Sequence, residues 1–228
     1  MAVRHGAKGL PMWKRALDLA LVVMLAPGLL VIGGVVALVV ACGSRGSVFF
    51  RQRRVGYQGQ IFECYKFRTM QENADTQQHR AHVQQLMEAD VPMTKLDAKA
   101  DPRLVPLGRL LRATGLDELP QVLNIIRGEM SFVGPRPCIP YEFEHYQSWQ
   151  RRRFAAAPGL TGLWQVSGKN RTTFNEMIRL DIEYSERQSL GLDLWIIMKT
   201  FPALLQQCVD LRAGKRRQPS AAVAVSVG

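Results

Sequence analysis

A run of uncharged, mostly apolar residues from Leu19 to Cys42 constrains the fold of this chain more than any other feature. At about 1.5 Å per residue, a helix of this length could cross a bilayer. The run is longer than the apolar core of a secretory signal peptide, and no small-residue cleavage site accompanies it. The sequence therefore predicts a membrane segment that the protein retains.

Two features favour a segment that enters and leaves the membrane on the same side. Pro27 removes one backbone hydrogen bond and kinks or breaks a helix. Both flanks are also basic, and the positive-inside rule places both in the cytoplasm. A re-entrant helix broken at Pro27 satisfies both demands, and a proline-kinked span is the alternative. The flanking basic residues are Arg4, Lys8, Lys14 and Arg15 before the run and Arg45, Arg51, Arg53 and Arg54 after it.

The charge is unevenly distributed. The formal net charge is +11, made up of +8 over residues 1–70, −3 over 71–150 and +6 over 151–228. A basic segment beside an apolar run indicates contact with anionic membrane lipids. A nucleic-acid binder would leave the apolar run unexplained, and no recognition-helix motif occurs. The cysteines form no CxxC pair, which argues against a zinc site or a secreted disulfide framework. They are Cys42, Cys64, Cys138 and Cys208.

The chain divides into three parts: a basic N-terminus with the membrane helix (1–45), one small compact α/β domain (46–212) and a disordered tail (213–228). Within the domain, strands are expected at 47–51 and 60–67, with a turn at 56–59 between them. Helices are expected at 70–87, 108–113, 117–128 and 173–188, a loop at 91–101, and further strands at 131–133 and 160–166. Residues 190–211 predict an amphipathic helix that lies on the membrane.

Asp117 and Glu118 are the first candidates for chemistry. Adjacent carboxylates at a helix start can share a divalent cation, and the helix-terminal N–H groups nearby can receive phosphate oxygens. The alternative is that Asp117 caps the helix and Glu118 is a first-turn acid, both with a structural role alone.

Basic residues surround this pair in the sequence. Arg112 lies five residues upstream, and Arg136 is held between Pro135 and Pro137, which restrict its backbone. Arginine suits bidentate phosphate binding, although a solvated helix face and a surface turn would also account for these two residues. Acids for a metal together with several cations are typical of phosphoryl transfer. Two further candidates, which could clamp a phosphate or face the membrane, are Lys66 and Arg68.

Two other polar residues are weaker candidates. Gln165 has an amide that could read a base or a sugar, whereas its neighbour Trp164 is more simply a core residue. Asp181 lies on the helix predicted at 173–188 and has a structural role at least as readily as a functional one. The four histidines form no motif.

These residues belong to short motifs that follow one another along the chain. They are KRALDL (Lys14–Leu19), VFFRQRRVG (Val48–Gly56), YKFRTM (Tyr65–Met70), DPRLVPLGRLLRATGLDELPQVLNIIRGEMSFVGPRP (Asp101–Pro137), PGLTGLWQVSGKN (Pro158–Asn170) and a DxxY pattern (Asp181–Tyr184). Over about residues 13–205 the chain resembles the bacterial sugar transferase family, the monotopic polyprenyl-phosphate phosphoglycosyl transferases.

The resemblance implies a re-entrant membrane helix and a cytosolic α/β domain with amphipathic helices at the interface. Asp117 would be the nucleophile that attacks a UDP-sugar, such as UDP-galactose or UDP-glucose, and releases UMP. Glu118 would bind Mg²⁺ with Asp117, and Arg112 and the Pro135–Pro137 turn would hold phosphates. Undecaprenyl phosphate would then take the sugar phosphate, at the cytoplasmic face of the bacterial inner membrane, in exopolysaccharide or O-antigen-type assembly.

Three positions depart from the family pattern: Gly115 replaces a usual Ser, Ala26 precedes Pro27 in place of Ser, and Lys169 replaces a usual Arg. None of them removes a carboxylate. A membrane-tethered scaffold without catalytic activity is the alternative function, and an altered acid pair would favour it, but the pair is intact. A homodimer is left open.

Overall fold

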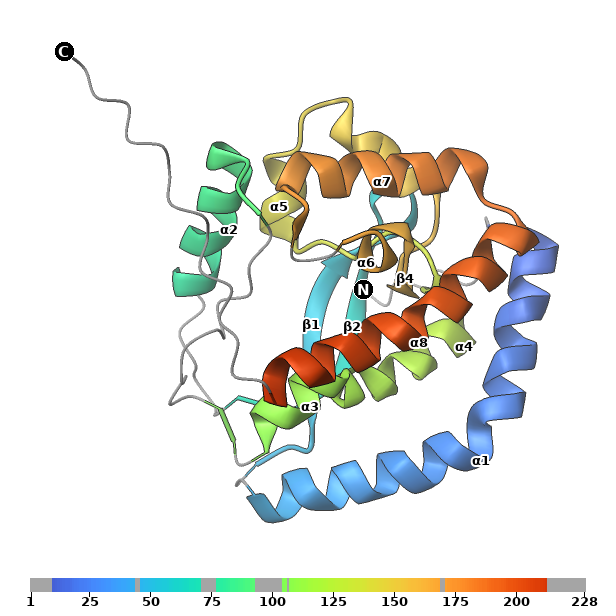
Figure 1. Ribbon diagram of the computed structural model, residues 1–228, viewed down its shortest axis with the longest axis vertical. Coiled ribbons are helices and arrows are strands. Elements are labelled where there is room, and N and C mark those ends of the chain that lie inside the picture. Colours follow the sequence, from blue (N-terminus) through green and yellow to red (C-terminus); the bar gives the residue numbers. More distant parts are fainter. Residues whose placement is uncertain are drawn as a thin grey trace, which may run out of the picture.

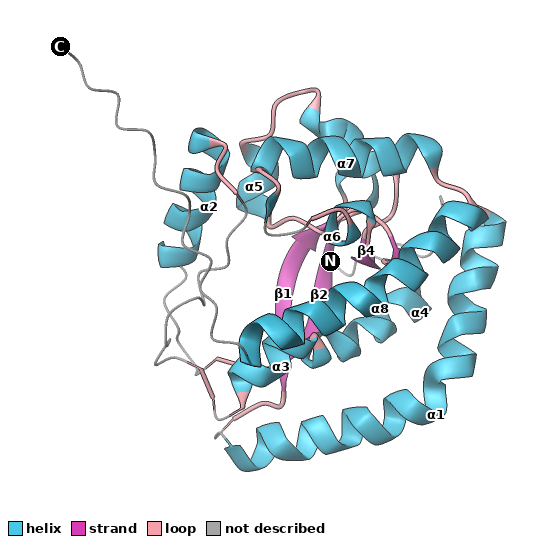
Figure 2. Cartoon of the chain, viewed as in Figure 1, coloured by secondary structure: helices cyan, strands magenta, loops and turns pink. Residues whose placement is uncertain are grey.

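The computed structural model describes residues 10–43, 46–70, 77–92, 104–105, 107–168 and 171–212. Figures 1 and 2 show a mixed helical and stranded domain flanked by one long N-terminal helix. The elements, in chain order, are α1 (Met12–Gly43), β1 (Phe49–Val55), η1 (Tyr57–Gly59), β2 (Ile61–Phe67), α2 (Gln77–Ala89), α3 (Gly108–Thr114), η3 (Leu116–Gln121), α4 (Val122–Arg127), β3 (Ser131–Val133), α5 (Pro140–Glu144), η4 (Gln150–Ala155), β4 (Gly159–Thr161), α6 (Leu163–Val166), α7 (Phe174–Arg187) and α8 (Leu190–Arg212).

The helix α1 continues through Pro27, so the prediction of a break at this proline is wrong in that respect. Figure 1 shows instead that α1 bends sharply near its middle, as expected where a proline removes one hydrogen bond from an otherwise intact helix. The buried residues of α1 lie toward its two ends and the exposed apolar ones between them. Among the described residues, α1 is the one helix long and apolar enough to cross a membrane. Its buried residues are Lys14, Asp18, Val36 and Val40.

The strands β1 and β2 form an antiparallel hairpin, from the pair Phe49–Phe67 at its open end to Val55–Ile61 beside the turn. This confirms the predicted hairpin, with β1 extending further toward the turn than expected. Because side chains alternate along a strand, Phe62 and Cys64 point into the core, where they pack with residues of α4 and its C-terminal loop.

The segment from α3 to α4 is set by glycines at its turns. Gly115 ends α3 with a φ of 74°, and Gly128 ends α4 with a φ of 76°; both values are in the left-handed region that glycine adopts readily. The helix predicted from Asp117 is confirmed in part, because its first residues form the tighter 3₁₀ turn η3. Pro120, which has no N–H to donate, lies in this turn.

The strands β3 and β4 form a short parallel pair. Their ends approach so closely that a Cβ on Gly134 would lie 2.1 Å from the Ala157 carbonyl oxygen. The strand predicted at 160–166 is wrong beyond Thr161, because residues 163–166 form the helix α6. The three residues of β3 offer no pairing for a longer strand, and in α6 the buried Trp164 donates a hydrogen bond to Thr172 at 2.6 Å.

The last two helices confirm the prediction of helices at 173–188 and 190–211. Thr173 caps α7 in a reciprocal bond pattern with Glu176.

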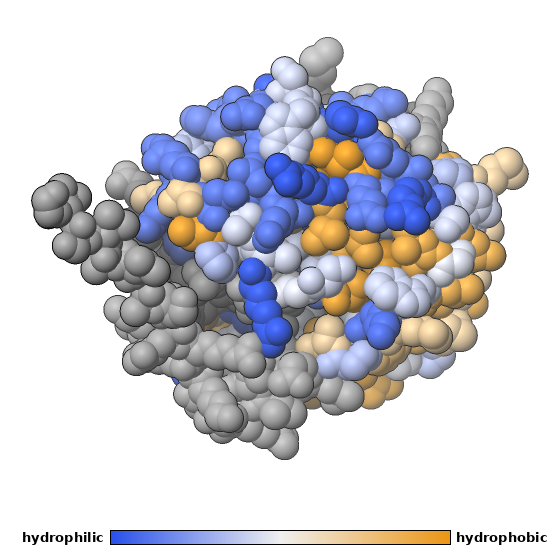
Figure 3. Space-filling model, turned by 45° about the horizontal axis from the view of Figure 1, so that its top comes forward, coloured by the Kyte–Doolittle hydropathy of each residue, from blue (hydrophilic) through white to orange (hydrophobic). Residues whose placement is uncertain are grey.

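In Figure 3, hydrophobic surface gathers on the right, the side on which α1 lies in Figure 1, and hydrophilic residues cover the upper part. The helix predicted at 70–87 is seen as α2. Residues 71–76 and 93–103 and the predicted tail lie outside the described residues. The exposed apolar residues include Leu123 and Ile126 on α4 and Leu194, Met198 and Phe201 on α8.

Candidate active site

The acid pair lies on η3, against the open end of the hairpin. Asp117 is 8% exposed, and Glu118 accepts a 2.8 Å hydrogen bond from Lys66 Nζ at the end of β2. Neither η3 nor α4 has a side-chain cap at its start. Gly115 and Gln121, not Asp117, stand at the cap positions of these two elements, and the structure brings Lys66 to the predicted pair.

The two other basic candidates near the pair have different surroundings. Arg112 is half-buried in the last turn of α3, the helix that leads into η3. Arg68 follows β2 and is buried, with its backbone N–H bonded to the Val48 carbonyl oxygen at 2.9 Å. Arg112 therefore lies on the helix that leads into the acid pair, whereas Arg68 is buried inside the domain next to the end of β2.

The Pro135–Pro137 turn is held by three charged side chains. Arg136 forms a forked ion pair with the buried Glu142, with Nη1 3.0 Å from Oε2 and 3.3 Å from Oε1. Arg54 donates to the Pro137 carbonyl oxygen at 2.9 Å, and Arg153 donates to the Arg136 carbonyl oxygen at 2.7 Å. The turn is therefore fixed at its backbone as well as at its arginine side chain.

Asp181 lies inside the domain, in an ion pair with the equally buried Arg153. Arg153 also donates to the Tyr146 hydroxyl at 2.6 Å. Burial raises the pKa of Asp181 to about 6, although the Arg153 and Arg136 charges act in the opposite direction. With no exposed surface, Asp181 supports the turn through Arg153, and the prediction that it binds substrate directly finds no support in this placement.

The acid pair and the turn lie toward opposite ends of one face of the hairpin. Phe62, the strand partner of Arg54, and Lys66 are four residues apart on the same side of β2, or roughly 13 Å. Cys64 lies between them. Burial raises the pKa of its thiol, and the positive charges of Lys66 and Arg54 act in the opposite direction.

Gln165 lies beside the start of the turn. Its side-chain oxygen is buried and has no hydrogen-bond partner among the described residues. Gly162 lies close to both the Gln165 amide and Gly134, which begins the turn. A Cβ added to Gly162 would lie 2.8 Å from the Gln165 oxygen and 2.2 Å from the Gly134 carbonyl oxygen. The amide therefore lies near the start of the turn. A buried amide oxygen without a partner is a candidate acceptor for a ligand.

The acid pair offers two carboxylates to a metal ion. No cluster of three or more His, Cys, Asp or Glu side chains with metal-ligand geometry occurs in the described part of the chain. Mg²⁺ is commonly bound by one or two carboxylates together with substrate phosphates and water. Asp117 and Glu118 thus fit an ion that arrives with a diphosphate, with Lys66 beside it.

The sequence analysis missed the residues that support the site, Arg54, Asn124, Glu142 and Arg153. Asn124 lies inside the motif Asp101–Pro137, and Glu142 lies two residues from Glu144, but nothing in the sequence shows that either side chain is buried. The run Arg151–Arg153 was a signal for Arg153, since three adjacent arginines place at least one toward the core of a short 3₁₀ helix.

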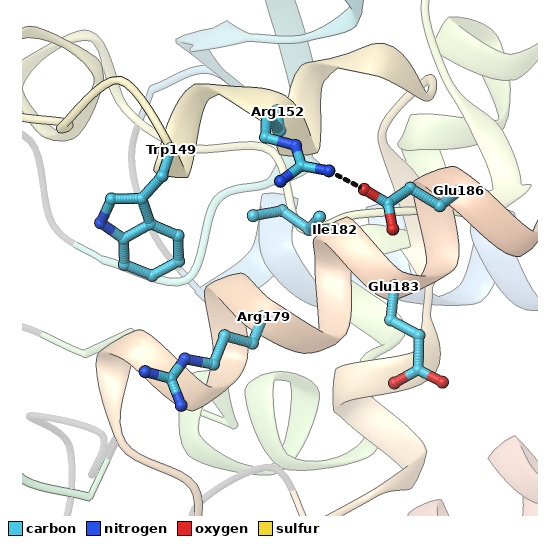
Figure 4. A pocket seen from close by; sticks show the side chains of 6 residues that line it. All are labelled: Trp149, Arg152, Arg179, Ile182, Glu183 and Glu186. Carbon is cyan, nitrogen blue, oxygen red and sulfur yellow. Dashed lines mark hydrogen bonds and ion pairs between the residues drawn. The ribbon is translucent and has the colours of Figure 1, made fainter.

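A separate hollow of about 290 Å³ lies between η4 and α7 (Figure 4). Its walls include an ion pair between Arg152 and Glu186. None of the predicted site residues lines it, so it is distinct from the candidate site. The lining residues are Trp149, Arg152, Arg179, Ile182, Glu183 and Glu186.

Comparison with known proteins identifies the family. Residues 10–207 match the family model described as bacterial sugar transferase. The chain belongs to this family. The sugar transferase is 40% identical over 195 residues to the exopolysaccharide production protein ExoY of Sinorhizobium fredii, with 84% of each chain covered.

Two further relatives have names that state a reaction. The sugar transferase is 37% identical to the UDP-glucose:undecaprenyl-phosphate glucose-1-phosphate transferase of Caulobacter vibrioides, over 84% of this chain and 69% of that protein. It is also 37% identical to the undecaprenyl-phosphate galactose phosphotransferase of Salmonella typhimurium, over 71% of this chain and 34% of that protein. The predicted family and enzyme class, a phosphoglycosyl transferase, are confirmed.

Proposed function

We propose that this sugar transferase moves a sugar 1-phosphate from a UDP-sugar to undecaprenyl phosphate and releases UMP. The names of the Salmonella and Caulobacter relatives support this reaction and favour a hexose, galactose or glucose, as the sugar. The name of the Sinorhizobium relative supports a role in exopolysaccharide production.

The observation that carries the proposal is the acid pair held against Lys66. In the first step an Asp117 carboxylate oxygen bonds to the sugar-bearing phosphorus, the bond from that phosphorus to the UMP oxygen breaks, and UMP leaves with the electron pair. In the second step a phosphate oxygen of the carrier bonds to the same phosphorus, and Asp117 leaves as a free carboxylate. Lys66, which contacts Glu118 at 2.8 Å, supplies positive charge beside the reacting phosphate.

Mg²⁺ fits this scheme through Asp117 and Glu118, where it would neutralise part of the diphosphate charge. Arg136 would bind a phosphate while its guanidinium keeps its ion pair with Glu142. Gln165 would accept a hydrogen bond from the sugar or the base.

We also propose that α1 is re-entrant and enters the cytoplasmic leaflet of the inner membrane. The packing of α1 supports this. Lys14 and Asp18 pack near β3 and α8, and Val36 and Val40 pack on Phe67 and Leu111 of the same domain. The exposed apolar middle of α1 would enter the lipid, and the basic flanks would meet anionic headgroups.

The test is UMP release by detergent-solubilised protein with undecaprenyl phosphate, Mg²⁺ and a panel of UDP-sugars. We expect release with UDP-galactose or UDP-glucose, and a loss of at least a thousandfold in Asp117→Asn because the amide is a poor nucleophile. Glu183→Gln, an equally small change in the hollow of Figure 4, is the matched control and should keep wild-type activity. UMP release by Asp117→Asn at the wild-type rate would contradict the assignment of the nucleophile. Folded wild-type protein that releases no UMP from any UDP-sugar would point to another nucleotide-sugar donor or to the scaffold function.

A further inference from the structure

One edge of β2 is paired by a side chain. The Asn124 amide oxygen accepts a hydrogen bond from the Tyr65 N–H at 3.1 Å, and the amide nitrogen donates to the Glu63 carbonyl oxygen at 2.7 Å. In a parallel ladder, one residue bonds in this way to the two residues that flank its partner. The Asn124 amide therefore takes the place of a peptide group from a further strand.

The Asn124 amide is also held by Glu129. Its nitrogen donates a second hydrogen bond to Glu129 Oε2 at 2.7 Å, and the Asn124 backbone oxygen accepts from the Glu129 N–H at 2.9 Å. Asn124 is 0% exposed, so its side chain makes these three bonds from a buried position. Buried polar groups with all their bonds satisfied specify one arrangement, because any displacement leaves a donor or an acceptor without a partner.

This contact joins the two elements that meet at the acid pair. Asn124 is six residues after Glu118, in the helix that continues η3, and its partner Tyr65 is next to Lys66. A slip of one residue along β2 would turn Lys66 to the opposite face of the strand. The 2.8 Å contact between Lys66 and Glu118 thus depends on the register at residues 63–65.

We propose that Asn124 is a positioning residue of the sugar transferase, which fixes the register of β2 against α4 and so holds Lys66 at Glu118. The inference rests on the proposed function to the extent that Glu118 and Lys66 belong to the reacting centre. Asn124 itself contacts neither of them, and its part is to set the distance between them.

The first test measures the contact without relying on activity. The full chain in detergent is treated with a water-soluble acetylating reagent, and acetylation of Lys66 is followed by mass spectrometry. Asn124→Leu, which keeps the size and removes the amide, should raise the rate at Lys66 at least fivefold. Ile125→Val is the matched control, because it removes one buried methyl group from the next residue, which packs on the face of β2, and leaves the two hydrogen bonds of Asn124 to the edge of β2 in place. Equal Lys66 rates in wild type and Asn124→Leu would overturn the proposal.

The second test separates positioning from folding. In a single turnover of UMP release, Asn124→Leu should react at least tenfold more slowly with its full amplitude, while Ile125→Val keeps the wild-type rate constant. A reduced amplitude with an unchanged rate constant would mean that Asn124 serves stability alone, and would overturn the proposal. If wild type releases no UMP while the Lys66 result holds, the proposed function fails and the register inference stands.

A second variant serves if Asn124→Leu does not fold. Asn124→Asp keeps the acceptor for Tyr65 but turns a carboxylate toward the Glu63 carbonyl and the Glu129 carboxylate. It should raise Lys66 acetylation, and adding Glu129→Gln, which supplies a donor in place of the second carboxylate, should restore at least half of the protection. Acetylation at the wild-type rate in Asn124→Asp would overturn the proposal as well.

Discussion

At the scale of single residues, the candidate site is assembled from charges whose partners are far away in the sequence. Lys66 meets Glu118 and Arg153 meets Asp181 across 52 and 28 positions. Buried charges are tolerated when they are paired and hydrogen-bonded, and breaking one partner costs more than the pair contributes. The Pro135–Pro137 turn therefore depends on Arg153 and Asp181 although neither is exposed.

Because Asp181 is buried, we expect the free energy of unfolding of the protein to depend on pH. Burial raises its pKa to about 6 in the folded protein, from 3.8. The folded state then holds a proton between about pH 4 and pH 6 that the unfolded state has lost. This contribution to stability is fully present below pH 4 and is lost as the pH rises through 6. Relative to Asp181→Asn, we expect the wild-type free energy of unfolding to fall by about 2 kcal/mol between pH 4 and pH 7.

The measurement is urea unfolding of both proteins in detergent at several pH values, and only their difference is used. Groups that titrate in both proteins, such as Glu142, cancel in that difference. If the wild-type free energy of unfolding instead rises with pH relative to that of Asp181→Asn, the charges of Arg153 and Arg136 outweigh burial and lower the pKa of Asp181.

The sequence analysis singled out the residues of the candidate site more readily than the residues that support them. Asp117, Glu118 and Lys66 stand in dense motifs, and the structure brings these three together. Asn124 and Glu142 were not singled out, because the residue types along the chain do not show that these two side chains are buried. The β2 partners of Asn124 are in addition 59 and 61 positions away.

At the scale of elements, local signals predicted the boundaries well. Gly115 and Gly128 ended helices where expected, because a positive φ is a property of one residue and its neighbours. The segment 160–166 was predicted incorrectly, because the length of β4 depends on β3, which lies about 30 residues earlier. Likewise, Pro27 marks a bend, but the sequence does not show that both ends of α1 pack on the same domain.

The start of α1 is joined to α8 by a buried ion pair. Lys14 Nζ lies 2.5 Å from Asp193 Oδ2 and 2.8 Å from the Tyr184 hydroxyl. Lys14→Met would leave the buried Asp193 carboxylate without its cation, and we expect a loss of about 3–5 kcal/mol in the free energy of unfolding. Chemical denaturation in detergent measures this loss.

Two further variants make this prediction specific. Adding Asp193→Leu to Lys14→Met removes the unpaired charge and should regain most of the lost stability. Lys199→Met, at an exposed lysine of α8 that stacks on Trp195, should change stability by less than about 1 kcal/mol. Equal effects of Lys14→Met and Lys199→Met would mean that the buried pair does not anchor α1.

At the scale of the whole molecule, apolar surface and charge are separated. Apolar residues are exposed on α1, α4 and α8, and hydrophobic surface gathers on one side of the view in Figure 3. The hollow between η4 and α7 is lined mostly by charged side chains (Figure 4). A large exposed apolar patch on a folded protein marks a surface that contacts lipid or another protein.

The proposed topology predicts that both ends of α1 face the cytoplasm. Single cysteines replace the exposed residues Met12 and Ser47, in a protein whose Cys42 and Cys208 are changed to Ser. In spheroplasts, a membrane-impermeant maleimide should label neither site until the membrane is permeabilised. The control is a periplasmic protein with an exposed cysteine, which should react at once. Labelling of one site in intact spheroplasts would instead show that α1 spans the bilayer.

The packing of both ends of α1 on one domain also bears on how the protein reaches its membrane. A helix that spans would require one of its basic flanks to be carried through the hydrocarbon during biosynthesis, at several kcal/mol for each charge. Lys14 and Val40 are held by the same folded body, so in the proposed topology no charged segment would cross. Insertion of the helix would then require no translocation of the chain.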